Sequence, residues 1–313
     1  MTDVYAYPRV IAWAKRQPWA VRREIAALIK DLLTRRALGL TVSLEQLDAR
    51  LASSPPAAAR PAAQRRGTIA ILPLNGIIAH RANLLVDVSG GTSTERFAAE
   101  FRAAVEDPAV DAIVLDVDSP GGGVYGVPEL ADEIFAARGR KPIVAVANAE
   151  AASAAYWIAS AADELVVTPS GQVGSIGVYM LHEDFSGALE QDGVSVTLVS
   201  AGEYKTEGNP FEPLSDEGRA YWQRVVDSYY DQFVRAVARG RGVTQTEVRE
   251  GFGQGRMVTA KEAERLGMVD RVETLPETLT RLAGRLARGG RARAEGEAEV
   301  DLRRRRQRLQ ELA

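Results

Sequence analysis

The sequence predicts an α/β fold with a largely parallel sheet. Between Thr68 and about Thr274, short apolar runs of strand length alternate with longer stretches of helical period, an order that is typical of strand–helix–strand units. The composition, with 46% hydrophobic and 26% charged residues, is that of a globular chain. At 313 residues the chain is long enough for one large domain or two ordinary ones.

The individual elements follow from local patterns. β-branched and aliphatic runs predict the strands, and apolar residues three to four apart predict the helices. The expected strands are Ile69–Leu74, Ala112–Val117, Ile143–Ala147, Glu164–Val167 and Val194–Val199. The expected helices are Thr94–Val105, Pro128–Arg138, Ala151–Ala161 and Ser215–Arg239.

Composition divides the chain into four zones. Residues 1–51 carry apolar side chains at helical spacing and are expected to form an N-terminal helical extension. Residues 52–67 are rich in Pro, Ala and Arg and are interpreted as a linker. Residues 68–274 hold the α/β domain, and residues 275–313 are predicted to be an Arg-rich helical tail.

Residue counts exclude several kinds of chemistry. With no cysteine, the chain has neither a thiolate nucleophile nor a cysteine metal site. Its two histidines, His80 and His182, lie far apart in sequence and in no motif, so we expect no metal and no cofactor. The net charge of −3 argues against nucleic-acid binding. The N-terminus shows neither a signal peptide nor an apolar run of membrane-spanning length, so we expect no membrane anchor and a cytoplasmic location.

Three small-residue clusters could carry chemistry. The first, Ser-Pro-Gly-Gly-Gly at 119–123, follows an expected strand. Gly121, Gly123 and Gly126 also match the dinucleotide fingerprint, but Asn148 stands where an acid should bind the ribose. Besides a plain structural turn, the remaining interpretation is a bare backbone whose N–H groups face a ligand, as an oxyanion hole requires.

The second and third clusters offer a nucleophile and a base. Ser153 lies among alanines where an apolar helix begins, and the first N–H groups of a helix can stabilise an oxyanion. Lys205 lies in a turn-rich loop of a chain with five Lys and thirty-four Arg. Lysine, unlike arginine, can lose its proton when desolvated and then act as a general base. Taken singly, Ser153 could equally be a small helix residue and Lys205 a surface lysine.

Together, the clusters resemble peptidase family S49, the signal peptide peptidase A (protease IV) group. The resemblance covers about Ile69 to Val272 and rests on Ser-Pro-Gly-Gly-Gly, Ala-Ala-Ser-Ala-Ala-Tyr-Trp, Gly-Ser-Ile-Gly-Val from Gly174, Glu-Tyr-Lys-Thr-Glu-Gly-Asn-Pro-Phe, and Leu-Gly-Met-Val-Asp ending at Asp270, in that order. It implies a ClpP/crotonase-like spiral of ββα units. Alanines after the serine and the missing anchor make the chain more similar to the phage capsid-assembly (head maturation) proteases, although only the short tail follows where many of those carry a scaffold segment.

The resemblance also implies roles for individual residues. Ser153 matches the nucleophile and Lys205 the general base. An oxyanion hole would come from Gly121, Gly122 and the N–H of Ala154, and Gly123 and Ser175 are candidate substrate-binding residues. The implied partners are a protein or peptide substrate, with capsid or scaffold proteins of a phage procapsid as candidates, and further copies of the chain in a ring.

Four alternatives stay open at this point. They are a signal-peptide-peptidase-like protease of the cell envelope, a crotonase-type acyl-CoA enzyme, a Ser–His protease that uses His80 or His182, and a non-catalytic assembly factor on the same fold. The helix expected at 215–239 carries Trp222, Tyr229, Tyr230 and Phe233. These aromatics are either core residues or contacts between subunits.

Overall fold

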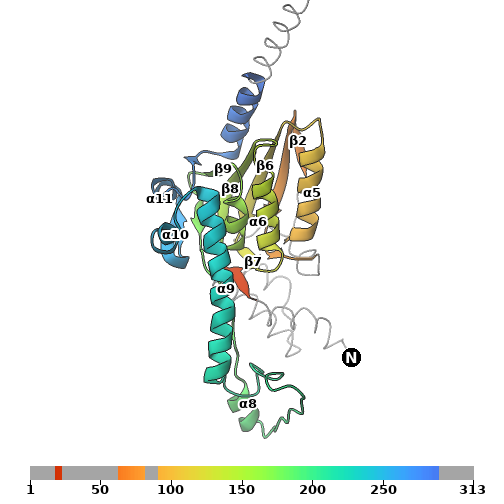
Figure 1. Cartoon of the computed structure of the whole chain (residues 1–313), viewed down its shortest axis with the longest axis vertical. Coiled ribbons are helices and arrows are strands. Elements are labelled where there is room, and N and C mark those ends of the chain that lie inside the picture. The colour runs from red at the N-terminus through yellow and green to blue at the C-terminus, as the bar shows by residue number, and fades with distance from the viewer. Residues whose placement is uncertain (1–17, 23–62, 82–90, 289–313) are drawn as a thin grey trace, which may run out of the picture.

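The computed structural model of the chain describes residues 18–22, 63–81 and 91–288. In these ranges the strands form one sheet of eight and one of four (Figure 1). The large sheet contains β2 (Gln64–Arg66), β3 (Ile69–Asn75), β6 (Ala112–Ser119), β8 (Ile143–Ala152), β9 (Glu164–Val167), β10 (Gln172–Gly174), β11 (Met257–Thr259) and β12 (Arg271–Val272). The small sheet contains β1 (Trp19–Val21), β4 (Ile78–Ala79), β5 (Thr92–Ser93) and β7 (Gly121–Gly123).

The chain winds through two repeats of a ββα unit. In the first, β3 and β4 lead through β5 to α5 (Thr94–Glu106), and in the second β6 and β7 lead to α6 (Val127–Ala136). In both units the first strand joins the large sheet and the second joins the small one. The strands β3, β6, β8 and β9 run parallel. The expected α/β class and its spiral of ββα units are therefore confirmed.

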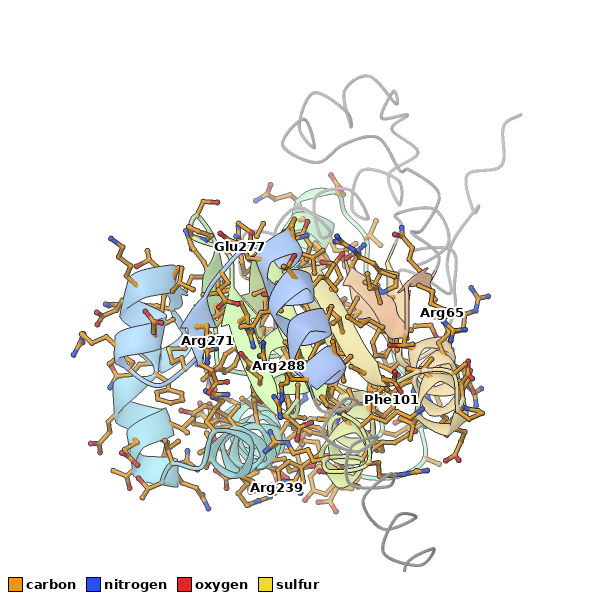
Figure 2. The ribbon with its side chains drawn as sticks, turned by 90° about the horizontal axis from the view of Figure 1, so that it is seen from above. Arg65, Phe101, Arg239, Arg271, Glu277 and Arg288 are labelled. Carbon is orange, nitrogen blue, oxygen red and sulfur yellow. The ribbon has the colours of Figure 1, made fainter. Side chains whose placement is uncertain are left out.

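Helices cover both faces of the large sheet. The described helices after α6 are α7 (Ala154–Ala159), α8 (Ser186–Gln191), α9 (Asp216–Arg241), α10 (Gln245–Gly251), the short 3₁₀ helix η1 (Gly253–Gly255), α11 (Ala260–Arg265) and a helix over 275–288. Along β6, Ile113 and Leu115 face the main core, whereas Ala112 and Val114 face a smaller core with Leu279. Figure 2 shows the 275–288 helix against the sheet, opposite α9 and α6. None of the helices described here combines the length and hydropathy that a bilayer crossing needs.

Most expected elements are found within a few residues of their predicted bounds. The main shift is at β8, which continues through Ala152 because its last three residues pair with β10. The helix expected from Ala151 therefore begins only at Ala154. Likewise, Gln64–Arg66, inside the expected linker, form an edge strand antiparallel to β3. The tail is helical over 275–288, and the rest of it lies outside the described residues.

Two segments differ from the prediction in kind. Val194–Val199 form no strand, and all six side chains are exposed. The apolar alternation indicates strand propensity, but no described segment lies alongside to take the backbone hydrogen bonds. Conversely, Trp19–Val21 lie in the range expected to be helical and form β1. Pro18 precedes them, and proline interrupts a helix. The remainder of 1–51 is outside the described residues.

An ion pair fastens α9 to the end of the large sheet. The Arg241 guanidinium donates to both Asp270 carboxylate oxygens at 2.8 Å, and the Leu165 N–H donates to the same carboxylate at 2.7 Å. Only 6% of the Arg241 side chain is exposed. Burial would raise the pKa of Asp270, but these hydrogen bonds outweigh it and hold the pKa below its ordinary value. The Leu-Gly-Met-Val-Asp motif thus has a structural role here.

We expect Asp270→Asn to destabilise the fold by about 2 kcal/mol at pH 7, because the substitution leaves the Arg241 charge without its carboxylate partner. Breaking a fully buried ion pair costs about 3–5 kcal/mol. The expected loss is smaller here because the Asp270 side chain is 39% exposed. The stabilisation exists above the unfolded pKa of about 3.9 and is lost as the pH falls through the lower folded value. Urea unfolding of parent and variant between pH 3 and 7 measures this. The exposed pair of Glu262 and Arg265 provides the control, Glu262→Gln, which should leave the midpoint unchanged. A constant gap between parent and Asp270→Asn at all pH values would contradict the expectation.

Candidate active site

Ser153 occupies a sharp turn between β8 and α7. Its backbone has φ 54° and ψ −117°, which a residue with a side chain adopts only under strain of about 1–3 kcal/mol. The Ser153 N–H donates to the Gly174 carbonyl of β10 at 2.7 Å and so holds the turn against the sheet. The side chain is 1% exposed, and its Oγ has no hydrogen-bond partner among the described residues. A buried, unsatisfied hydroxyl at a strained turn is a candidate nucleophile.

The glycines of β7 lie directly beside this serine. A methyl group added at Gly121 would lie 3.0 Å from Ser153 Cβ and 2.9 Å from the Ala152 carbonyl oxygen, so only glycine fits there. The Gly121 N–H donates to Ser119 Oγ at 3.1 Å and is therefore engaged in this structure. Gly121 and Gly122 are both proposed for the oxyanion hole. The Ser119 side chain accepts from the Gly121 N–H but not from the Gly122 N–H, so Gly122 is the better candidate donor.

The other expected site residues fall in the same region. Ala154 begins α7, so its N–H belongs to the first helical turn, which lacks intrahelical acceptors. Gly123 ends β7 and is buried. Ser175 follows β10 with φ 54°, and its N–H donates to the Arg256 carbonyl at 2.9 Å. Ser153, Ala154, β7 and the β10 end therefore meet in one place.

The fold of a single chain does not place Lys205 beside Ser153. Lys205 is exposed, in a segment that packs on the first half of α9. Tyr204 lies close to Glu217 there, and a methyl group at Gly208 would touch the Trp222 ring. Figure 1 shows α8 and this segment at the end of α9 that projects beyond the sheets.

The other end of α9 is the part that reaches the Ser153 turn. There Phe233 stacks on Trp157 of α7 with ring centroids 4.5 Å apart. The eleven residues from Trp222, beside the Lys205 segment, to Phe233, beside α7, span ~16 Å of helix. Lys205 and Ser153 therefore lie toward opposite ends of α9. Phe233 is also fully buried, so it is a core residue of its own chain.

The histidines have local structural partners. The His182 ring hydrogen-bonds the Asn209 carbonyl at 2.9 Å and packs edge-on against Trp222, in the same projecting segment as Lys205. The His80 ring lies 3.2 Å from Thr94 Oγ1. In the described ranges, no three acidic or histidine side chains are grouped to hold a metal ion.

Sequence reasoning missed two contributors to the site. Ser119 accepts from the Gly121 N–H and donates to the Gly76 carbonyl at 2.6 Å, so it orients β7; its place two residues before Gly121 was the available signal. The other contributor is β1, whose Ala20 carbonyl oxygen would overlap with a methyl group at Gly121. Pro18 was the only sign that this segment leaves the helical pattern.

Comparisons with known proteins agree with the sequence motifs. The model of peptidase family S49 matches residues 136–287, a range that contains both Ser153 and Lys205. A putative protease of Synechocystis sp. is 30% identical over 191 residues, which cover 60% of this chain and 69% of that protein. The chain belongs to peptidase family S49.

Two phage proteins are also similar to this S49 chain. Capsid assembly protease C of Escherichia phage lambda is 36% identical over 232 residues, which cover 72% of this chain. Head-tail preconnector protein GP5 of Enterobacteria phage P21 is 36% identical over 216 residues, which cover 67% of this chain. The S49 chain spans 53% and 43% of the lengths of these two relatives.

Proposed function

We propose that this S49 chain is a serine endopeptidase in which Ser153 is the nucleophile and Lys205 the general base. The observation that carries the proposal is the position of Ser153. Its hydroxyl is buried and unpartnered at a strained turn, beside the bare backbone of β7 and at the first turn of α7. Such a hydroxyl needs only a base and a carbonyl to begin acyl transfer.

The reaction follows from these positions. Neutral Lys205 takes the hydroxyl proton as Ser153 Oγ bonds to the peptide carbonyl carbon, and the N–H groups of Gly122 and Ala154 stabilise the oxyanion. The tetrahedral intermediate then breaks its C–N bond, and the leaving amine takes the proton from Lys205. Water repeats both steps on the acyl-enzyme, which releases the new carboxyl terminus and restores Ser153.

We infer that the base comes from a second copy of the chain. Lys205 is held on the projecting half of α9 by the contacts at Glu217 and Trp222, and Phe233 holds the other half at the Ser153 turn. Because α9 is one continuous helix, the Lys205 segment at one end and the Ser153 turn near the other end stay apart within one chain. A head-to-tail ring, in which each projecting segment reaches the neighbouring Ser153, would complete every site.

Mixing two inactive variants tests this arrangement. Ser153→Ala and Lys205→Ala should each abolish cleavage of a protein substrate, whereas co-expressed copies should recover about a quarter of the parent activity, because one interface in four pairs an intact serine with an intact lysine. Parent mixed with each variant is the control for dilution. Activity in the co-expressed sample no higher than in the separate variants, with assembly unchanged by light scattering, would refute a shared site.

For the biological setting, we propose maturation of a phage prohead, with capsid or scaffold proteins as substrates. The similarity to the lambda and P21 proteins supports this setting. The proteins encoded beside this chain test the setting: portal and capsid genes are expected, and neighbours that belong to the cell envelope would contradict it.

The distance between Lys205 and Ser153 in one chain also favours a second candidate, a non-catalytic assembly factor. A fluorophosphonate that labels active serines separates the two. The peptidase should gain one adduct on Ser153 in the assembled protein, seen by intact mass. An assembled protein that gains no adduct and cleaves no substrate would be an assembly factor.

A further inference from the structure

Residues 18–22 lie as a strand between two other parts of the chain. On one side β1 pairs antiparallel with β7, with Ala20 opposite Gly122. On the other side the Trp19 N–H donates to the Tyr179 carbonyl at 3.0 Å, and the Tyr179 N–H donates back at 3.1 Å. An extended segment that is hydrogen-bonded along both edges has the geometry of a peptide bound by strand addition.

The segment closes over the Ser153 turn. Trp19, Ala20 and Val21 are 6%, 0% and 3% exposed, and Ala20 belongs to the main core. Outside the strand, the Arg22 guanidinium forms an ion pair with Glu150, three residues before Ser153, at 2.9 Å. With the segment in place, Ser153 is 1% exposed. No other peptide could reach the hydroxyl without displacing it.

The carbonyl of Ala20 lies beside Ser153 and Gly122. A Cβ atom built on Gly121 would contact both the Ala20 carbonyl oxygen and Ser153 Cβ. These two atoms are therefore close neighbours. Along the ladder of β1 and β7, hydrogen-bonded residue pairs alternate with pairs that are not hydrogen-bonded. The Arg22 N–H donates to the Pro120 carbonyl and the Val124 N–H donates to the Pro18 carbonyl, so the pairs at both ends of the ladder are hydrogen-bonded. By that alternation Ala20 and Gly122 form a hydrogen-bonded pair. The Ala20 carbonyl therefore faces the N–H that we assign to the oxyanion hole.

We propose that Pro18–Arg22 is an internal inhibitor that occupies the peptide-binding groove in place of substrate. This inference rests on the proposed function, because it takes the space beside Ser153 as that groove. Ala20 stands where the residue before the cleaved bond would stand, and it is fully buried there. Since the segment is part of the same chain, it competes with substrate intramolecularly and must leave before a substrate binds.

Displacing the segment should open the groove. Arg cannot fit at the buried Ala20, so Ala20→Arg should expel the strand, and Ala63→Arg places the same change at an exposed position. Both are made with Ser153→Ala, so that the readout needs no catalysis. A labelled peptide of sequence 17–23 should bind Ala20→Arg at least tenfold more tightly than Ala63→Arg, by fluorescence anisotropy. Equal binding by the two would overturn the proposal.

A reversible lock keeps the test valid if Ala20→Arg fails to fold. The chain has no cysteine, and the hydrogen-bonded pair of Trp19 and Tyr179 has the spacing that a disulfide accepts. Trp19→Cys with Tyr179→Cys, also in the Ser153→Ala protein, should cross-link on oxidation. The oxidised form should bind the peptide at least tenfold more weakly than the reduced form. Tyr179→Cys alone should show no redox effect.

The two proposals fail in different ways. If no cross-link forms, or if the oxidised and reduced forms bind the peptide equally, the inhibitory segment is refuted whatever the catalytic activity. With Ser153 intact, Ala20→Arg should cleave a protein substrate at least tenfold faster than Ala63→Arg. If the peptide binds as expected but no variant cleaves a substrate, the proposed peptidase activity is refuted, whereas the proposal that residues 18–22 occupy a peptide-binding groove is retained.

Discussion

Replacing Ser153 by alanine should lower the rate of peptide cleavage by about 10⁴-fold or more while the fold stays intact. The hydroxyl has no hydrogen-bond partner among the described residues, so its removal breaks no structural contact. Alanine also fits a turn whose neighbours on both sides are alanine. The loss should therefore appear in kcat, measured on a protein substrate, and urea unfolding should give a midpoint close to that of the parent.

A second serine, which follows the last residue of α7, provides the matched control. Ser160 is as buried as Ser153, but its hydroxyl donates to the Trp157 carbonyl at 2.9 Å. Ser160→Ala should lose about 1 kcal/mol of stability, the worth of one hydrogen bond, and keep its activity. Cleavage by Ser153→Ala at the parent rate would remove Ser153 from the mechanism and leave its strained turn without a catalytic explanation.

Replacing Gly122 by alanine should damage both activity and stability. A methyl group there would overlap with the Ile78 carbonyl oxygen and lie 2.6 Å from the Ile78 carbonyl carbon, both backbone atoms of β4 that cannot rotate away. The strands β4 and β7 must separate, which we expect to cost about 3 kcal/mol of unfolding free energy. Moving the Gly122 N–H, our proposed oxyanion donor, should also lower kcat by about 10²–10³-fold.

The chain offers a glycine at which the same change is harmless. Gly251 ends α10, and a methyl group there would meet nothing within 4 Å. Gly251→Ala should match the parent in unfolding midpoint and in rate, or be slightly more stable because alanine favours helix. If Gly122→Ala also matched the parent in both measurements, β7 would have to be freer to move than its packing against β4 implies, and its role in the oxyanion hole would be lost.

The accuracy of the sequence predictions depended on where the stabilising contacts come from. The strands β3, β6 and β8 were predictable because each is an apolar run buried on both faces, which few other structures accommodate. Val194–Val199 carry an alternating apolar pattern that also favours a strand, yet they lie exposed, since a strand also needs a neighbour and none of the described segments supplies one. The end of β8 was missed for the converse reason, because pairing with β10 extends it.

The sequence alone predicted the central strands β3, β6, β8 and β9 and the main helices between them, and its resemblance to S49 supplied Ser153 as the candidate nucleophile. These depend on local patterns and on spacing along the chain. Only the tertiary structure decided that Lys205 lies beside the projecting half of α9, away from its own Ser153, and that Trp19–Val21 pair with β7 next to Ser153. Both depend on contacts between segments that are distant in sequence, such as Phe233 with Trp157 and Arg22 with Glu150. Local periodicity carries no information about such contacts, because it records which face of a segment is buried and not what covers it.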